Sequence, residues 1–169
     1  MWNAFLRRVM DGNDEMIAFL QRAVGYSLTG SVSEQCLFFL YGNGRNGKST
    51  FTGTIHNLLE PYAMKAPNDL VQLKPNGSEG IPNDIAELPG KRFVYSNELD
   101  EGRKMAEARV KDMAGGDVLK ARFMRANWFQ FWPTHKLWIY GNHRPTITGQ
   151  DDGIWRRIRL LPFNQTFEG

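Results

Sequence analysis

Apolar residues in the first part of the chain recur at helical spacing. They fall at Trp2, Phe5, Leu6 and Val9 and, after the polar break "DGND", at Ile17, Leu20 and Val24. Residues three and four apart lie on one side of an α-helix, so each group forms an apolar face. The pattern predicts two short amphipathic helices, the second ending at Gly25. We expect this helical segment, residues 1–30, to pack on a core domain formed by residues 31–169.

Four later segments are apolar without alternation, which is typical of strands buried on both faces of a parallel sheet. They are Cys36 to Tyr41, "RFVYSN", "KLWIYGN" and "RIRLLPF". Helical spacing returns between them, over Phe51 to Leu59 and again over Arg103 to Met113. Strands that alternate with helices predict an α/β fold in which helices flank a mainly parallel sheet.

Two stretches interrupt this alternation. Residues 61–91 hold most of the prolines, and we expect them to be mostly loop around a short helix from Asp84 to Leu88. Residues 117–131 are rich in β-branched and aromatic side chains around a polar centre, Arg125 to Asn127. This second pattern predicts an inserted β-hairpin.

Composition narrows the class of protein. With 169 residues, of which 41% are hydrophobic and 23% charged, the chain suits one soluble globular domain. No apolar run approaches the ~20 residues of a membrane span, and the start of the chain lacks the pattern of an export signal. Because Cys36 is the single cysteine, we expect a cytoplasmic protein without internal disulfides. A net charge of +3 permits a nucleic-acid partner without requiring one.

The stretch "YGNGRNGKST" carries the strongest chemical signal, because it matches the phosphate-binding P-loop pattern between an expected strand and an expected helix. Glycines tolerate positive φ and lack Cβ, so backbone N–H groups can converge on phosphate oxygens at the start of a helix. The expected nucleotide-binding residues are Gly42, Asn43, Gly44, Arg45, Asn46, Gly47, Lys48, Ser49 and Thr50. Lys48 would hold the β- and γ-phosphates, and Ser49 would offer its hydroxyl to Mg²⁺. The alternative is a flexible glycine-rich hairpin with a solvated lysine.

Two acidic residues, Glu98 and Asp100, follow the expected strand "RFVYSN". A period of two places both side chains on the same side of an extended chain. One of them can hold Mg²⁺ through water while the other polarises the attacking water. The competing interpretation is an acidic surface turn.

Polar residues also mark the last two expected strands. Asn142 follows "KLWIYG", where an amide can contact the γ-phosphate or orient the attacking water, although a turn would suit it equally. Arg156 and Arg157 precede the last strand, and guanidinium groups of this kind stabilise a transferring phosphoryl group, often from a neighbouring subunit. A solvated charge pair is the alternative.

Five motifs in this order resemble those of superfamily 3 helicases, specifically the C-terminal NTPase domain of phage, plasmid and large-DNA-virus primase-helicases. They are "FFLYGNGRNGKST" as Walker A, "GKRFVYSNELDEG" as Walker B, "VKDMAGGDVLKARFMRANWFQFWPTHKLW" as the segment between motifs B and C, "GNHRP" as motif C and "DDGIWRRIRLLPF" as the arginine motif. The resemblance covers nearly the whole chain. It departs from the family pattern at Leu99, which separates two acids that are usually adjacent.

The resemblance implies an AAA+-like P-loop NTPase that assembles as a homo-oligomeric, hexameric ring, hydrolyses ATP with Mg²⁺ between subunits, and moves on single-stranded DNA. It implies Walker A roles for Lys48 and Ser49, and Walker B roles for Glu98, as a metal ligand, and Asp100. Asn142 would be the motif C sensor, and Arg156 or Arg157 the finger acting in trans. It also implies a primase domain outside this chain, and a site of action in the bacterial cytoplasm or at a viral replication site.

The expected hairpin falls where this family has its channel hairpin. It carries Lys120, Arg122 and Arg125, and basic side chains at such a place can follow the phosphate backbone of single-stranded DNA. We expect most of the nearby aromatic residues to fill the packed face of the hairpin instead. These are Phe123, Trp128, Phe129, Phe131 and Trp132.

Two other functions remain open from the residues. The first is a P-loop kinase that phosphorylates a small molecule, which should carry an acceptor pocket and an arginine-rich lid. Here the arginines lie at the start of the last expected strand, which favours an ATP-driven helicase motor. The second is a nucleotide-gated DNA-binding module without efficient turnover.

Overall fold

The computed structural model describes residues 1–73, 83–97, 105–145, 147 and 152–167. Within these residues, five parallel strands form one sheet in the order β2-β3-β6-β1-β7. The strands are β1 (Leu37–Tyr41), β2 (Ala63–Lys65), β3 (Phe93–Ser96), β6 (Lys136–Gly141) and β7 (Ile158–Pro162). The expected α/β fold with a parallel sheet is therefore confirmed.

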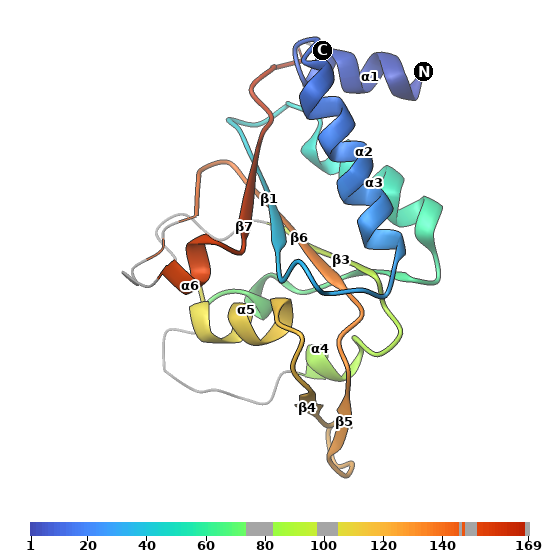
Figure 1. The fold of residues 1–169 in the computed structure, drawn as a ribbon, viewed down its shortest axis with the longest axis vertical. Helices are drawn as coiled ribbons and strands as arrows, with labels where there is room; N and C mark the ends of the chain where they lie inside the picture. The colour runs from blue at the N-terminus through green and yellow to red at the C-terminus, as the bar shows by residue number, and fades with distance from the viewer. Residues whose placement is uncertain (74–82, 98–104, 146, 148–151, 168–169) are drawn as a thin grey trace.

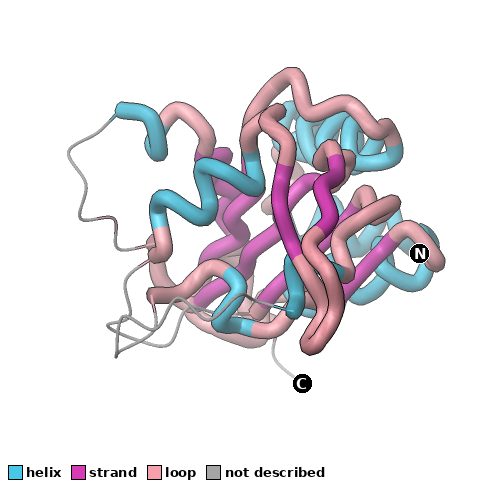
Figure 2. The backbone as a smooth tube through the Cα atoms, turned by 90° about the horizontal axis from the view of Figure 1, so that it is seen from below, coloured by secondary structure: helices cyan, strands magenta, loops and turns pink. Residues whose placement is uncertain are grey.

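Helices cover both faces of the sheet (Figures 1 and 2). They are α1 (Trp2–Val9), α2 (Asp14–Leu28), α3 (Lys48–Leu59), α4 (Asn83–Ala86), α5 (Glu107–Ala114) and α6 (Asp152–Trp155), with a 3-10 turn at Asn68–Leu70. Apolar residues of α1, α2 and α3 pack on one face, and those of α4, α5 and α6 pack on the other. Each strand therefore lies between two layers of helices.

Alternation along the strands divides the core into two clusters. Phe38 and Leu40 of β1, with Trp138 of β6, pack against α1, α2 and α3. Phe39 of β1 and Leu137 of β6 pack against α5 and α6. Because both sides of β1 and β6 are buried, their sequences show continuous apolar runs instead of an alternating pattern.

Two features differ from the expected ones. The edge strand β2 lies within residues 61–91, which were expected to be mostly loop. The sequence does not indicate this strand, because three residues between prolines are too few to show a period. The helix α2 continues past Gly25 to Leu28, since Ser27 is buried and accepts a hydrogen bond from Trp138 Nε1 at 3.0 Å. The last turn is therefore held by a contact with β6 that the local sequence does not show.

The expected hairpin is present as β4 (Leu119–Ala121) and β5 (Phe129–Phe131), and it projects away from the sheet (Figure 1). Phe129 and Phe131 are half-buried, as expected of residues on a packed face. Phe123, Trp128 and Trp132 are 46%, 45% and 69% exposed, so the prediction that they fill that face was wrong. The hairpin is too small to cover so many aromatic side chains by itself.

A buried histidine, His135, lies directly before β6. It is 2% exposed, and neither ring nitrogen finds a hydrogen-bond partner among the described residues. Burial, with a smaller contribution from the charge of Lys136, lowers the pKa of His135 to about 4. The folded protein therefore holds this imidazole neutral at pH values where the unfolded chain protonates it.

We expect this histidine to make folding stability depend on pH. Between pH 6.5 and pH 4 the unfolded chain binds a proton that the folded protein does not, so the free energy of unfolding falls as the pH falls. Lowering the pH from 7.5 to 5 should cost about 2 kcal/mol through His135. Urea unfolding at both pH values, with His135→Leu beside the parent, measures this; the same pH dependence in the two proteins would contradict it.

Candidate functional site

The loop between β1 and α3, residues 42–47, has an unusual backbone. Gly42, Gly44, Arg45 and Gly47 have φ of 153°, 91°, 46° and 84°. The three glycines adopt their values without the strain that a Cβ adds, whereas Arg45 adopts a left-handed conformation with a Cβ present. The chain therefore turns back on itself between strand and helix, as the glycine spacing predicts.

The end of β7 fastens this loop. Asn46 Nδ2 donates to the carbonyl oxygen of Phe163 at 2.7 Å, and the backbone N–H of Phe163 donates to the Tyr41 carbonyl at 2.8 Å. A Cβ at Gly42 would overlap both the Phe163 carbonyl oxygen and the Asn46 amide. Glycine is required at this position because another strand approaches too closely for a side chain.

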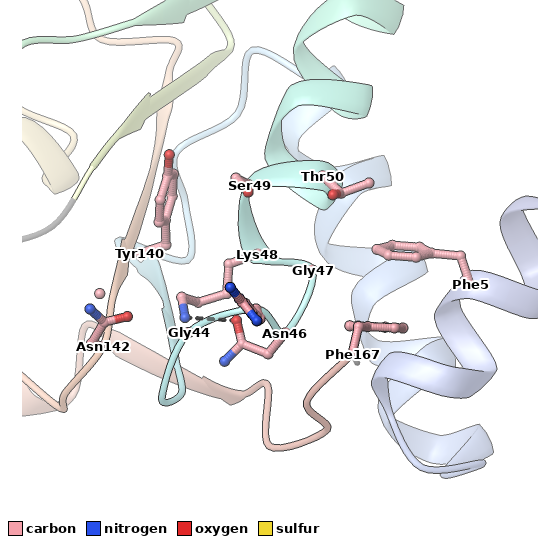
Figure 3. A pocket seen from close by; sticks show the side chains of 12 residues that line it. Phe5, Gly44, Asn46, Gly47, Lys48, Ser49, Thr50, Tyr140, Asn142 and Phe167 are labelled. Atoms are coloured by element: carbon pink, nitrogen blue, oxygen red, sulfur yellow. Dashed lines mark hydrogen bonds between the residues drawn. The ribbon is translucent and has the colours of Figure 1, made fainter. Parts of the chain in front are cut away.

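Lys48 lies inside the curve of the loop and is 6% exposed. Its Nζ donates to the Gly42 carbonyl at 2.6 Å. It also donates to Asn46 Oδ1 at 2.8 Å (Figure 3). A buried ammonium group needs hydrogen-bond acceptors, and these two satisfy part of that need. The loop thus holds a positive charge at the start of α3, where the helix dipole also favours anions.

A cavity of about 590 Å³ opens beside Lys48. This volume is within the usual range for small-molecule pockets, which is ~300–1,000 Å³. Its lining comes from the loop, the start of α3, the end of β6, α1 and the segment after β7. The residues are Phe5, Gly44, Arg45, Asn46, Gly47, Lys48, Ser49, Thr50, Tyr140, Gly141, Asn142 and Phe167.

The end of β6 forms one side of the cavity. Asn142 lies there, and a Cβ at Gly44 would be 4.0 Å from its Oδ1. The hydroxyl of Tyr140 donates to Asn97 Oδ1, which links the carboxyl ends of β6 and β3. Ligands of parallel α/β sheets commonly bind at this edge.

The structure brings some of the predicted site residues together and separates others. Most of the loop and Asn142 line one cavity. Glu98 and Asp100 lie outside the described residues, so their roles remain predictions. No group of three acidic, histidine or cysteine side chains suited to a metal ion occurs among the described residues.

Arg156 and Arg157 lie at the opposite end of the sheet from the loop. The N–H of Leu37, the first residue of β1, donates to the Arg157 carbonyl at 2.9 Å, whereas the loop follows the last residue of that strand. Five residues of strand separate the two ends by roughly 16 Å. Arg156 is exposed, while Arg157 is half-buried and donates to the Gly153 carbonyl at 2.6 Å and to Gln35 Oε1 at 3.4 Å.

The hairpin carries the three basic residues that were predicted to bind DNA. The charged groups of Lys120 and Arg122 lie 5.1 Å and 4.9 Å from the ring centroid of Trp128, within the range of cation–π contacts. Arg125 is exposed at the tip and has a φ of 61°. The hairpin that carries these residues projects from the fold, away from the loop between β1 and α3 (Figure 1).

Sequence reasoning missed four residues that line the cavity. Phe5 belongs to an apolar helix face, Tyr140 and Gly141 lie at the end of an apolar strand, and Phe167 follows the last strand. Each of these patterns indicates core packing, so no local signal distinguishes these residues. Only the meeting of α1, β6 and the segment after β7 around the loop identifies them.

Comparison with known sequences finds similarity to proteins of large DNA viruses. Residues 40–157 match a family described as "Family of unknown function (DUF5906)". The chain is 28% identical over 169 residues to "Putative helicase L207/L206" of Acanthamoeba polyphaga mimivirus, covering 98% of this chain and 17% of that protein. It is 26% identical over 140 residues to "Primase D5" of Fowlpox virus, covering 80% of this chain and 17% of that protein. The chain thus spans about one sixth of these relatives.

Solved structures share the fold. The apo structure of the NrS-1 C-terminal region, in its A form, matches with a TM-score of 0.74 and 13% identity, over 97% of this chain and 38% of that one. A second apo structure of this region has a TM-score of 0.68 over the same shares. Among the described helices, none combines the length and apolarity needed to cross a membrane.

Proposed function

The chain belongs to the DUF5906 family. From its viral relatives and its loop geometry we propose that it is the ATP-hydrolysing motor of a DNA helicase. In this proposal, the domain moves on single-stranded DNA as part of a homo-oligomeric, hexameric ring. The relatives named as helicases and a primase support a helicase-type role, and their greater length supports the presence of a primase domain elsewhere in the full protein.

The observation that carries the proposal is the buried Lys48 inside a glycine loop. Its ammonium group donates to the Gly42 carbonyl and to Asn46, both within the loop that would surround the phosphates. The start of α3 adds backbone N–H groups, and the cavity has room for a nucleotide. A triphosphate fits this arrangement because charge, N–H donors and space occur together.

The residues of the loop take separate roles in this proposal. Lys48 binds the β- and γ-phosphates, and Asn142, on the far side of the cavity, contacts the terminal phosphate or orients the attacking water. Ser49 and Glu98 would hold Mg²⁺, which neutralises phosphate charge when it is bound. Glu98 and Asp100 share the metal-binding and general-base roles.

The arginine finger is assigned to Arg156. Its position beside the start of β1 prevents it from reaching the loop of its own chain, so it would act on a nucleotide bound by a neighbouring subunit. Arg157 is less suited, because its guanidinium group already bonds Gly153 and Gln35. An oligomer in which the start of β7 faces the loop of the next subunit satisfies this geometry.

The hairpin would hold the DNA. Lys120 and Arg122 beside Trp128, with Arg125 at the tip, offer positive charge to phosphates on a segment that projects from the domain. Six copies in a ring would strengthen an individually weak contact.

Measurement of ATP turnover with and without single-stranded DNA tests this function. We expect DNA to raise turnover in the parent protein, and Arg125→Ala to keep turnover without DNA but lose the stimulation. Arg7→Ala serves as the control, since Arg7 is an exposed arginine on α1, outside the hairpin, and should leave stimulation unchanged. Phosphorylation of a small molecule would instead indicate a kinase, and binding without turnover would indicate a nucleotide-gated module; either result contradicts the motor.

A further inference from the structure

We propose that Phe5 and Phe167 form a subsite for the base of the bound nucleotide, an inference that rests on the nucleotide binding proposed above. Both side chains are half-buried, and both line the same cavity as Lys48 and Ser49. The ligand group that the subsite would take is a flat aromatic base, which packs on phenyl side chains.

The two phenyl groups lie on the side of the cavity where a base would be expected. Figure 3 shows Asn142 on one side of the loop, Phe5 and Phe167 on the other, and Ser49 and Thr50 above the loop. A nucleoside triphosphate is an elongated molecule, with its terminal phosphate and its base at opposite ends. If the terminal phosphate lies near Asn142, the base lies near the aromatic pair.

Contacts within the protein hold Phe167 in place. Its backbone N–H donates to the Arg45 carbonyl of the loop at 2.7 Å, and the guanidinium carbon of Arg8 lies 4.6 Å from its ring centroid. Residue 167 is therefore tied to the loop that would bind the phosphates. A phenyl group fixed in this way loses little further freedom when a ligand packs on it, which favours binding.

Contacts with α1 and the loop hold Phe5. Its ring is nearly parallel to that of Phe167, with centroids 6.4 Å apart and an interplanar angle of 12°. Trp2 stacks on it with centroids 5.2 Å apart, and a Cβ at Gly47 would lie 3.0 Å from its Cε2. Phe5, near the start of the chain, and Phe167, near its end, thus both contact the loop between β1 and α3.

These contacts also allow a purely structural role, in which the pair only joins α1 to the segment after β7. The two roles differ in one measurable property. A base subsite affects a ligand that has a base and leaves a bare phosphate chain unaffected. A pair with a purely structural role, which only maintains the shape of the loop, affects the binding of both ligands equally.

The test compares ATP with inorganic tripolyphosphate, each with Mg²⁺, by titration calorimetry on the parent, Phe5→Leu and Phe167→Leu. Leucine keeps apolar packing and removes the aromatic face. Phe19→Leu is the matched control, because Phe19 packs on Phe38 in the same core and does not line the cavity. The base subsite predicts that Phe5→Leu and Phe167→Leu weaken ATP binding by about tenfold and leave tripolyphosphate binding unchanged.

The other outcomes separate the two proposals. Unchanged affinity for both ligands, or an equal loss for both, in the Phe5 and Phe167 variants would overturn the base subsite and leave nucleotide binding intact. A parent protein that binds neither ligand would overturn the proposed function itself. Circular dichroism on each variant shows whether a loss reflects unfolding, and the Phe167 variant provides the test if the Phe5 variant does not fold.

Discussion

Lys48→Ala should reduce ATP turnover by at least about 10²-fold while the fold is retained. Lys48 carries the positive charge inside the loop, where it is 6% exposed and its Nζ donates to the Gly42 carbonyl and to Asn46. A charge aimed at phosphates in a buried site stabilises the transition state more than it would in water. Steady-state release of phosphate from ATP, measured with DNA present, gives the rates.

Two further variants separate charge from packing. Lys48→Met keeps a long side chain without the charge and should lose turnover to the same extent. Lys91→Ala removes a lysine that donates to the Pro61 carbonyl at 2.9 Å outside the cavity, and it should keep turnover near the parent value. Turnover within twofold of the parent in Lys48→Met would show that the charge has no role in the reaction and would contradict the site.

Arg156→Ala should lower ATP turnover by about 10³-fold without weakening ATP binding by more than a small factor. Arg156 lies far from the loop of its own chain, and in the proposed oligomer it acts on the nucleotide of a neighbouring subunit. Arg157→Ala should instead lower the melting temperature, because its guanidinium group bonds Gly153 and Gln35 within the chain. Turnover assays and thermal unfolding distinguish the two results.

Mixing two inactive variants tests whether Arg156 of one subunit acts on the nucleotide bound by another. Lys48→Ala retains Arg156 but lacks the loop charge, and Arg156→Ala retains the loop. Subunits that alternate in a mixed oligomer would place an intact arginine beside an intact loop, so the mixture should regain part of the turnover. No recovery in oligomers shown to contain both variants would contradict an arginine finger that acts between subunits.

Much of the fold could be predicted from the sequence, because the signals were local. The continuous apolar runs ending at Tyr41 and Gly141 reflect strands buried on both faces, a property that each segment carries by itself. The three-residue strand β2 escaped prediction because its pairing with β3 is decided by the sheet. The exposure of Trp128 and Trp132 was not predicted either, because an aromatic-rich segment indicates a strand but does not indicate which residues cover its side chains.

The sequence by itself determined the glycine loop between β1 and α3 and the order of the elements around it. Gly42 and Gly47 have positive φ, and the helix begins at Lys48. The sequence indicates both features directly, because glycine is the residue type that a backbone with positive φ favours. Only the tertiary structure decided what surrounds this loop. It brings Phe5 and Phe167 beside the loop from opposite ends of the chain and sets Arg156 at the far end of the sheet. Such contacts depend on how distant segments pack and on the register of strands, which no local pattern of residues encodes.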